Sequence, residues 1–310
     1  MALGVDGFRV GCWTDRVHAT GCTVVLSPEG TLGAMAVRGG APGTREGAAL
    51  GPTGKIKECH AVVLSGGSAF GLATADGVVD WCVGHGIGYD KAVARIPIVG
   101  AAIVFDLRVA GAPRPGRDAG WAACEAAVDD DPAMGAVGVG AGCTVGKTAG
   151  IEHAARSGQG IAVARGGGVT VGALIAVNAL GDVLDERGEV LAGSRAPAGS
   201  PRFPFVGPVV AEVESTVIGC LVTDARLDKH EAWRAADLAS SGIARAVEPA
   251  HTTYDGDALF LLCAQRVPAS VDVVAHLGAQ AVSAAIRAAV RAVAAPSAPA
   301  PGAAGGETAR

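Results

Sequence analysis

Residues 215–219, Ser-Thr-Val-Ile-Gly, mark the point where a Pro-rich, irregular segment becomes an apolar run with a Thr at its first position. Thr, Val and Ile favour strands, so the run is predicted to open a buried strand, and Thr216 can be a plain strand residue. It can also be a nucleophile. If the Ser215–Thr216 bond were cut, a new α-amino group with a pKa of about 7.7 to 8.0 would lie on the residue whose hydroxyl it must deprotonate.

Strand-like and helix-like segments alternate on both sides of this stretch, which is typical of an α/β fold. Periodicity predicts strands over residues 22–26, 34–37, 61–64, 96–106, 171–178, 217–222 and 258–264. It predicts helices over residues 70–86, 120–128, 228–247 and 271–293. Asp228 is the expected N-cap of the third helix, and Arg287 and Arg291 are expected on the wetter side of the fourth. Residues 193–208 contain four Pro and should form an exposed, mobile loop.

The composition excludes several classes of protein. Half of the 310 residues are hydrophobic but only 4% are aromatic, and there are 47 Gly, so the core must be built from small aliphatic side chains with backbones in close approach. The net charge is -5 and the basic residues are scattered, which argues against a nucleic-acid partner. No leader pattern or long uninterrupted apolar run is seen. We therefore expect a protein of the cytoplasm without a membrane partner.

Two polar residues interrupt the apolar middle of the chain. Residues 141–148 nearly match a phosphate-binding loop, but Ala141 stands where the first Gly belongs, and several Gly follow where a sturdy helix is needed. Lys147 could instead act as a cation near a catalytic centre. A plain surface Lys is disfavoured within so apolar a segment, because an ammonium that is buried without a partner is costly. Asn178 ends an apolar run, and its amide either caps a turn or donates an N–H to a developing oxyanion.

Two glycine turns carry further candidate groups. Asp255 and Asp257 bracket Gly256, and they form either a plain turn or a pair of carboxylates that could hold an ammonium group and tune its pKa. Ser65 and Ser68 bracket two Gly and could supply a nucleophile or an anion loop, although a strand-to-helix turn explains the glycines equally well. The eight Cys and seven His show no metal-ligand spacing, so no metal site is predicted.

A series of ordered blocks extends over nearly the whole chain: residues 37–46 (VRGGAPGTRE), 60–76 (HAVVLSGGSAFGLATAD), 95–107 (RIPIVGAAIVFDL), 144–147 (TVGK), 177–178 with 181–182, 216–219 with 223–225, and 251–257 (HTTYDGD). Together the blocks resemble the L-aminopeptidase/D-esterase family, which includes β-aminopeptidases and nylon-oligomer endo-amidases. These are self-cleaving amide hydrolases with an N-terminal Ser or Thr nucleophile. The resemblance implies an αββα four-layer sandwich, layered like other N-terminal nucleophile hydrolases but differently connected.

The resemblance also implies how the chain is organised. Residues 1–295 would form one hydrolase domain, cleaved into residues 1–215 and 216–310, with a disordered tail over 296–310. The cleaved subunits would assemble as a homo-oligomer, as is common in the family, and we expect a tetramer. Substrates would be small peptides, β-peptides, D-amino esters or related amides, and no cofactor would be required.

The family's site residues are carried onto matching positions of this chain. Thr216 would be the nucleophile released after Ser215, Asn178 would stabilise the oxyanion, and the polar centre would be completed by Lys147, Asp255 and Asp257. The substrate pocket would include Phe105, with Ser65 and Ser68 as further candidates.

This chain departs from the family pattern at two positions. Ser215 stands where members often carry Asn or Gly, and Phe105 stands where some members place a catalytic Tyr. Two rival interpretations therefore stay open. One is a small-molecule-binding protein of the same fold that has lost processing, and the other is an acyl transferase similar to ornithine acetyltransferase.

Overall fold

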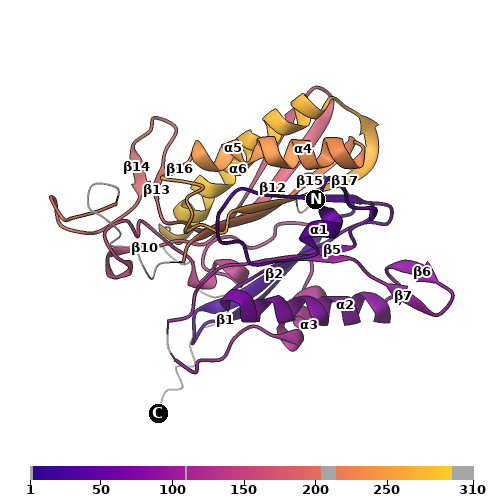
Figure 1. The fold of residues 1–310 in the computed structure, drawn as a ribbon, viewed down its shortest axis with the longest axis horizontal. Coiled ribbons are helices and arrows are strands. Elements are labelled where there is room, and N and C mark those ends of the chain that lie inside the picture. Colours follow the sequence, from indigo (N-terminus) through magenta and orange to yellow (C-terminus); the bar gives the residue numbers. More distant parts are fainter. Residues whose placement is uncertain (1–2, 109, 204–213, 295–310) are drawn as a thin grey trace, which may run out of the picture.

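The computed structural model describes residues 3–108, 110–203 and 214–294 and has four layers (Figure 1). Two helices, α2 and α3, lie against one β-sheet, that sheet faces a second one, and α4, α5 and α6 cover the outer face of the second sheet. Apolar side chains fill all three spaces between the layers. The predicted αββα sandwich is confirmed.

The first sheet has the strand order β1-β2-β5-β8-β4. Its strands are β1 (Arg9–Asp15), β2 (Thr20–Leu26), β5 (Ala61–Ser65), β8 (Val99–Ile103) and β4 (Thr44–Arg45). Only β5 and β8 are parallel neighbours in this sheet. A parallel pair needs a crossover connection, which here contains η1 (Ser68–Ala73) and α2 (Thr74–Gly84). α3 (Arg117–Glu125) packs beside α2.

The second sheet has the order β11-β12-β15-β17-β3. Its strands are β11 (Gln159–Gly166), β12 (Val169–Asn178), β15 (Thr216–Arg226), β17 (Ala258–Pro268) and β3 (Leu32–Val37). β15 and β17 are parallel, and their crossover contains α4 (Lys229–Ala239) and α5 (Ser241–Ala244). α6 (Val271–Ala294) packs on β11 and β12. The start of β15 therefore lies beside the end of β12 and the start of β17.

The central strands are apolar on both faces because each separates two cores. On β5, Val62 faces the other sheet while Val63 faces α2 and α3. On β15, Ile218 faces the first sheet while Leu221 faces α4 and α6. This alternation explains why the sequence of these strands is a continuous apolar run without polar residues at every second position.

Short elements complete the described chain. They are α1 (Gly47–Leu50), the ribbon β6 (Tyr89–Lys91) and β7 (Ala94–Ile96), η2 (Gly138–Gly142), β9 (Thr144–Val145), η3 (Ile151–His153), β10 (Ala155–Arg156), β13 (Asp182–Leu184), β14 (Val190–Ala192) and β16 (Val247–Glu248). β9 pairs with β10, and β13 pairs with both β14 and β16. In Figure 1 the strands β10, β13 and β14 lie on the left.

Three predicted boundaries were wrong for local reasons. The strand expected over residues 96–106 is divided: Ile96 ends β7, and β8 begins only at Val99 because Pro97 cannot donate to a ladder; β8 ends at Ile103. The helix expected over residues 120–128 begins and ends three residues earlier, and the backbone of Val128 pairs with Val10 instead. The helix expected over residues 228–247 divides at Ser240, whose hydroxyl donates to the Ala236 carbonyl at 3.2 Å.

Other predictions at the helix ends are confirmed or refined. Asp228 caps α4 in a capping box with Glu231, so that each side chain accepts from the other's backbone N–H. Arg291 is exposed as expected, but Arg287 is half-buried, and its guanidinium donates to the carbonyls of Leu184, Asp185 and Arg245.

α6 alone among the described helices is long and apolar enough to cross a membrane by length and hydropathy. In the fold, however, 67% of that stretch is buried, as in a core helix.

Seven of the eight free cysteines are also buried, and Cys12 is half-buried. Residues 193–203 of the predicted loop are irregular and half-buried to exposed after β14. The predicted tail over 296–310 lies outside the described residues.

Candidate active site

Thr216 and Asn178 are brought together by strand pairing. β12 and β15 are antiparallel, and their last ladder pair joins Asn178 to Thr216. Thr216 is 5% exposed and Asn178 is fully buried. The side chain of Asn178 is held on both ends: its Oδ1 accepts from the Thr144 backbone N–H at 3.0 Å, and its Nδ2 donates to the Phe105 carbonyl at 3.0 Å. The amide is therefore fixed by contacts from distant segments and does not cap a local turn.

The peptide bond between Ser215 and Thr216 has a polarised carbonyl. The Ser215 oxygen accepts from the Gly256 backbone N–H at 2.8 Å and from the Thr216 hydroxyl at 2.5 Å. The Ser215 N–H donates to the Tyr254 carbonyl, so the segment just before β15 is itself paired beside the turn that precedes β17. A hydroxyl and an N–H donor thus meet at one carbonyl, and this arrangement suits attack on that carbonyl.

Lys147 is buried at the same place. It is 1% exposed, and its Nζ donates to the carbonyl of Asn178 at 2.8 Å, to Asn178 Oδ1 at 3.0 Å and to Ser215 Oγ at 3.4 Å. Burial lowers the pKa of Lys147 to about 7, against the opposing effect of Asp255 nearby. The loop is followed directly by the short η3 and by β10, and an α-helix does not begin behind it, so the phosphate-loop interpretation loses its structural support.

Asp257 ties the start of β15 to a histidine. Its Oδ1 accepts from the Val217 backbone N–H at 2.7 Å, and its Oδ2 accepts from His251 Nδ1 at 2.8 Å. His251 Nε2 faces the Ser240 carbonyl at 3.2 Å, so both ring nitrogens face acceptors. Burial opposes the charge on His251, but the hydrogen bond and charge of Asp257 outweigh it and raise the pKa of the imidazole. The pair resembles a fixed imidazolium–carboxylate contact.

Asp255 has a different environment from its neighbour. Its Oδ2 accepts from the backbone N–H of Thr252 at 2.9 Å and from the Thr252 hydroxyl at 2.6 Å. Burial, followed by the charge of Asp257, raises the pKa of Asp255. The turn between the two carboxylates lies against Gly39, where a Cβ would stand 2.1 Å from the Asp255 carbonyl oxygen. Only Gly allows this approach, which explains how the block over residues 37–46 contributes to the site.

The three weaker candidates are placed differently. Phe105 contributes its carbonyl to Asn178 and lines a cavity of about 380 Å³ next to it. Ser65 is buried at the end of β5, in the first sheet, and its hydroxyl donates to the Gly66 carbonyl at 3.0 Å. Ser68 begins η1 with a positive φ of 54°. Neither serine has a hydrogen bond to Lys147, Asn178 or Thr216 in the described structure.

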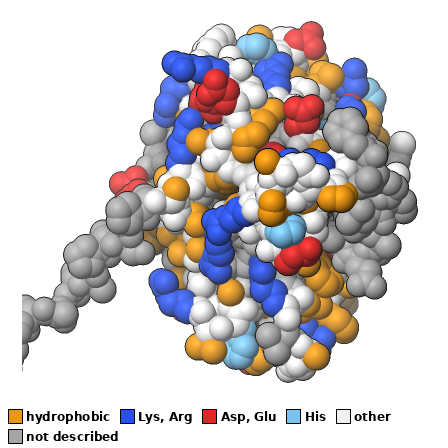
Figure 2. Space-filling model, turned by 90° about the vertical axis from the view of Figure 1, so that its left-hand side faces the viewer, with side chains coloured by type: hydrophobic (Ala, Val, Ile, Leu, Met, Phe, Trp, Pro, Cys, Tyr) orange, Lys and Arg blue, Asp and Glu red, His pale blue; other side chains and the backbone are white. Residues whose placement is uncertain are grey.

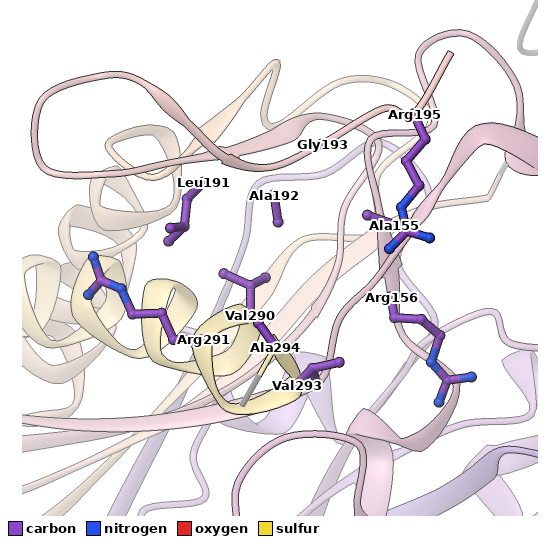
Figure 3. Close-up of a pocket in the computed structure, with 10 residues that line it drawn as sticks. All are labelled: Ala155, Arg156, Leu191, Ala192, Gly193, Arg195, Val290, Arg291, Val293 and Ala294. Atoms are coloured by element: carbon purple, nitrogen blue, oxygen red, sulfur yellow. The ribbon is translucent and has the colours of Figure 1, made fainter. Parts of the chain in front are cut away.

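A larger cavity of about 450 Å³ is lined in part by Ala155 and Arg156 of β10 (Figure 3). Its apolar wall includes Leu191 and Val290, and its charged groups are Arg156, Arg195 and Arg291. None of the residues that line it belongs to the polar centre described above. In the described part of the chain no cluster of three or more His, Cys, Asp or Glu could hold a metal ion.

Sequence reasoning did not single out several groups at this centre. His251, Thr252 and Gly256 lie in the block over residues 251–257, which was quoted for its two carboxylates, and Thr144 lies in the block that contains Lys147. His251 is six residues before Asp257, and no spacing rule pairs them. The positive φ of 57° at His251 turns its side chain back toward that carboxylate, and this is a tertiary feature.

Comparisons with known proteins identify the family to which this chain is related. The model of peptidase family S58 matches residues 3–298. An uncharacterized aminopeptidase of Mycobacterium bovis is 40% identical over 287 residues, which cover 84% of this chain and 78% of the relative. A 6-aminohexanoate-oligomer endohydrolase of Paenarthrobacter ureafaciens is 29% identical over 278 residues, which cover 86% of this chain and 76% of that enzyme.

Two solved structures share the fold. The L-aminopeptidase D-Ala-esterase/amidase of Ochrobactrum anthropi, described as a variant of the Ntn hydrolase fold, superposes with a TM-score of 0.69 at 20% identity, covering 93% of this chain and 85% of that one. A β-aminopeptidase of Burkholderia gives a TM-score of 0.68 at 21% identity, covering 93% and 85%. At this identity the likeness concerns the arrangement of the layers.

Proposed function

Because the chain belongs to peptidase family S58, we propose that it is an amide hydrolase that creates its own nucleophile by cutting the Ser215–Thr216 bond. Membership confirms the resemblance drawn from the sequence blocks and favours a hydrolase over a binding protein or an acyl transferase. The observation that carries the proposal is the Thr216 hydroxyl, 2.5 Å from the Ser215 carbonyl oxygen inside a buried polar cluster.

Self-cleavage follows from the contacts at this bond. The Thr216 oxygen adds to the Ser215 carbonyl carbon, and the Gly256 N–H, 2.8 Å from the carbonyl oxygen, stabilises the negative charge that develops there. The C–N bond then breaks, the nitrogen takes up the proton that the Thr216 hydroxyl has lost, and Ser215 is held on Thr216 as an ester. Water hydrolyses the ester, which leaves a free α-amino group and a free hydroxyl on Thr216.

Turnover uses the groups that cleavage releases. The α-amino group of Thr216 takes the hydroxyl proton, and the hydroxyl attacks the substrate carbonyl. Asn178 Nδ2 donates one hydrogen to Phe105, and its second hydrogen is available for the substrate oxyanion. One such donor contributes about 3 kcal/mol to the stabilisation of a transition state. The C–N bond of the substrate then breaks, and the departing amine takes the proton from the α-amino group of Thr216. Water hydrolyses the remaining ester and releases the acyl group, and no cofactor takes part.

The charged residues position these groups. Lys147 holds both the side-chain and the backbone oxygen of Asn178, so the amide cannot rotate away from Thr216. Asp257 fixes the backbone N–H of Val217, which directly follows the nucleophile, and His251 holds Asp257 in place. Asp255 lies beside Ser215 through a parallel bridge and orients the turn that presents Gly256.

Substrates of this site are small peptides, β-peptides, D-amino esters or related amides. The relatives named as an aminopeptidase and as an oligomer endohydrolase support this range. We further propose that cleaved subunits assemble as a homotetramer in the cytoplasm. Size-exclusion chromatography with light scattering measures the number of subunits.

Intact mass and N-terminal sequencing of the purified protein test the proposal. We expect two chains, residues 1–215 and 216–310, the second beginning Thr-Val-Ile-Gly. A panel of aminoacyl, β-aminoacyl and D-amino p-nitroanilides and esters then identifies the acyl group. A protein that stays a single chain and still hydrolyses amides at full rate would contradict the proposed nucleophile.

A further inference from the structure

A cavity of about 380 Å³ lies next to the residues that hold Asn178. Its lining residues are Phe105, Asp106, Leu107, Arg108, Thr144, Ile151 and Glu152. Two of them hold Asn178 directly, since the Phe105 carbonyl accepts from Nδ2 and the Thr144 N–H donates to Oδ1. These two residues place the cavity next to the amide that is proposed to bind the substrate carbonyl.

Arg108 gives the cavity a positive charge. Its side chain is exposed, and one Nη2 hydrogen is used in a 2.8 Å bond to the Gly142 carbonyl. In the part of the chain that the structure describes, Arg108 forms no ion pair with a carboxylate. Guanidinium groups carry five N–H donors in a planar fork that matches a carboxylate. Most of this fork remains available to a ligand.

The two acidic residues of the cavity differ in burial. Asp106 is 5% exposed and its Oδ1 accepts from the Gly67 N–H at 2.7 Å, whereas its buried Oδ2 has no hydrogen-bond partner in the described structure. Burial raises the pKa of Asp106, although the charge of Arg108 opposes the rise. Glu152 is exposed, 3.7 Å from His153 Nε2. The cavity therefore combines the Arg108 cation and the buried Asp106 carboxyl with the apolar side chains of Phe105, Leu107 and Ile151.

The surface near the cavity carries charges of both signs. Figure 2 views the molecule from the side on which β10 lies in Figure 1, and several Lys and Arg side chains lie near the middle of that face with Asp and Glu side chains beside them. η3, which supplies Ile151 and Glu152 to the cavity, is followed directly by β10. Nearby cations favour the approach of anionic ligands even on a chain of net charge -5.

We propose that the enzyme selects amide substrates that carry a carboxylate, which Arg108 binds while Phe105, Leu107 and Ile151 pack against the short apolar chain between that carboxylate and the scissile amide. This inference rests on the proposed function, since it assigns a specificity to the same site. Arg108 does not act on the reacting atoms. It determines which substrates are positioned against Asn178.

The test compares substrates that differ only in charge. Three alanyl anilides of similar shape vary the charge on the amine side. The 4-carboxyanilide is anionic, the 4-carbamoylanilide is neutral and the 4-(aminomethyl)anilide is cationic. On the acyl side, glutaryl anilide is compared with its 4-carbamoylbutyryl counterpart. We expect kcat/KM to favour the anionic member of at least one series by about tenfold to a hundredfold, the usual effect of a hydrogen bond between charged groups. Arg108→Gln should remove that preference mainly through KM.

The matched control is Arg114→Gln, which removes an equal charge from a neighbouring arginine whose guanidinium lies 3.8 Å over the Phe70 ring. Arg114→Gln should keep the preference, whereas Arg108→Lys should restore part of it. Hydrolysis of the neutral amides by Arg108→Gln is measured in parallel and should fall much less than hydrolysis of the anionic amides. Equal rates on all charges in the native enzyme, a preference for the cationic amide, or equal losses in both Gln variants would overturn the inference. Absence of hydrolysis of every amide would instead contradict the proposed function.

Discussion

Two buried hydroxyl groups stand at the ends of central strands, one in each sheet. Thr216 begins β15 and Ser65 ends β5, and each strand has a parallel neighbour reached through a helical crossover. Each hydroxyl donates to a backbone carbonyl next to it in sequence, Ser215 in one case and Gly66 in the other. Strand position and burial therefore do not distinguish them.

What differs is the set of groups around each hydroxyl. The Thr216 region receives an ammonium from Lys147, an amide from Asn178 and a carboxylate from Asp257, each from a different segment. The Ser65 region has the buried carboxyl of Asp106 near Gly66, and that carboxyl is engaged with a backbone N–H of the same glycine turn. A strand-end hydroxyl becomes a candidate nucleophile where oppositely charged and polar groups from several segments converge on it.

The strongest test of this contrast is Thr216→Ala. It removes the proposed nucleophile, so self-cleavage and amide hydrolysis should both fall by at least roughly four orders of magnitude. Gel electrophoresis measures the first and p-nitroanilide turnover the second. Thr216→Ser is the matched control, because it keeps a hydroxyl on a residue that becomes N-terminal. If the Thr216→Ala protein still splits into two chains, another group must cut the Ser215–Thr216 bond.

The next largest effect is expected from Lys147→Met, which keeps the length of the side chain and removes its donors. Asn178 then loses the Lys147 contact to each of its two oxygens, and the rate of turnover should fall roughly a hundredfold to a thousandfold, as when an oxyanion donor is lost. Circular dichroism should show a retained fold. Lys229→Met is the control, since Lys229 also donates to a carbonyl, that of Gly33, outside the site. Equal losses of turnover in both variants would show that Lys147 has no special role in the active centre.

Much of this organisation could be predicted from the sequence, and the failures have local causes. The apolar runs of β5, β12, β15 and β17 were recognisable because these strands are buried on both faces. The ends of helices were predicted wrongly where a single residue stops the helix, as Ser240 does after α4. The resemblance supplied the candidate residues, but it did not supply contacts such as His251 to Asp257 or Gly39 against the Asp255 turn, which depend on how distant segments meet.

Burial of the Lys147 ammonium also predicts a dependence of stability on pH. The pKa of Lys147 is about 7 in the folded chain and 10.5 in its reference state. Between these values the unfolded chain binds more protons, so the free energy of unfolding should rise with pH, by at most about 1.4 kcal/mol per unit. Thermal unfolding of the uncleaved Thr216→Ala protein is compared with that of the Thr216→Ala/Lys147→Met protein. The rise from pH 7 to pH 10 should be smaller in the second, and equal rises would mean that the ammonium is not buried.

The smallest effect is expected at Ser65, the second of the two hydroxyl groups compared above. Ser65→Ala removes one hydrogen bond to the Gly66 carbonyl, which should lower the free energy of unfolding by about 1 kcal/mol. Self-cleavage and turnover should stay within twofold of the native values, because the hydroxyl has no contact with Lys147 or Asn178 in the described chain. If Ser65→Ala instead abolished turnover in a protein that still cuts itself, Ser65 would be the nucleophile for substrates. The convergence of Lys147, Asn178 and Asp257 around Thr216 would then serve processing alone.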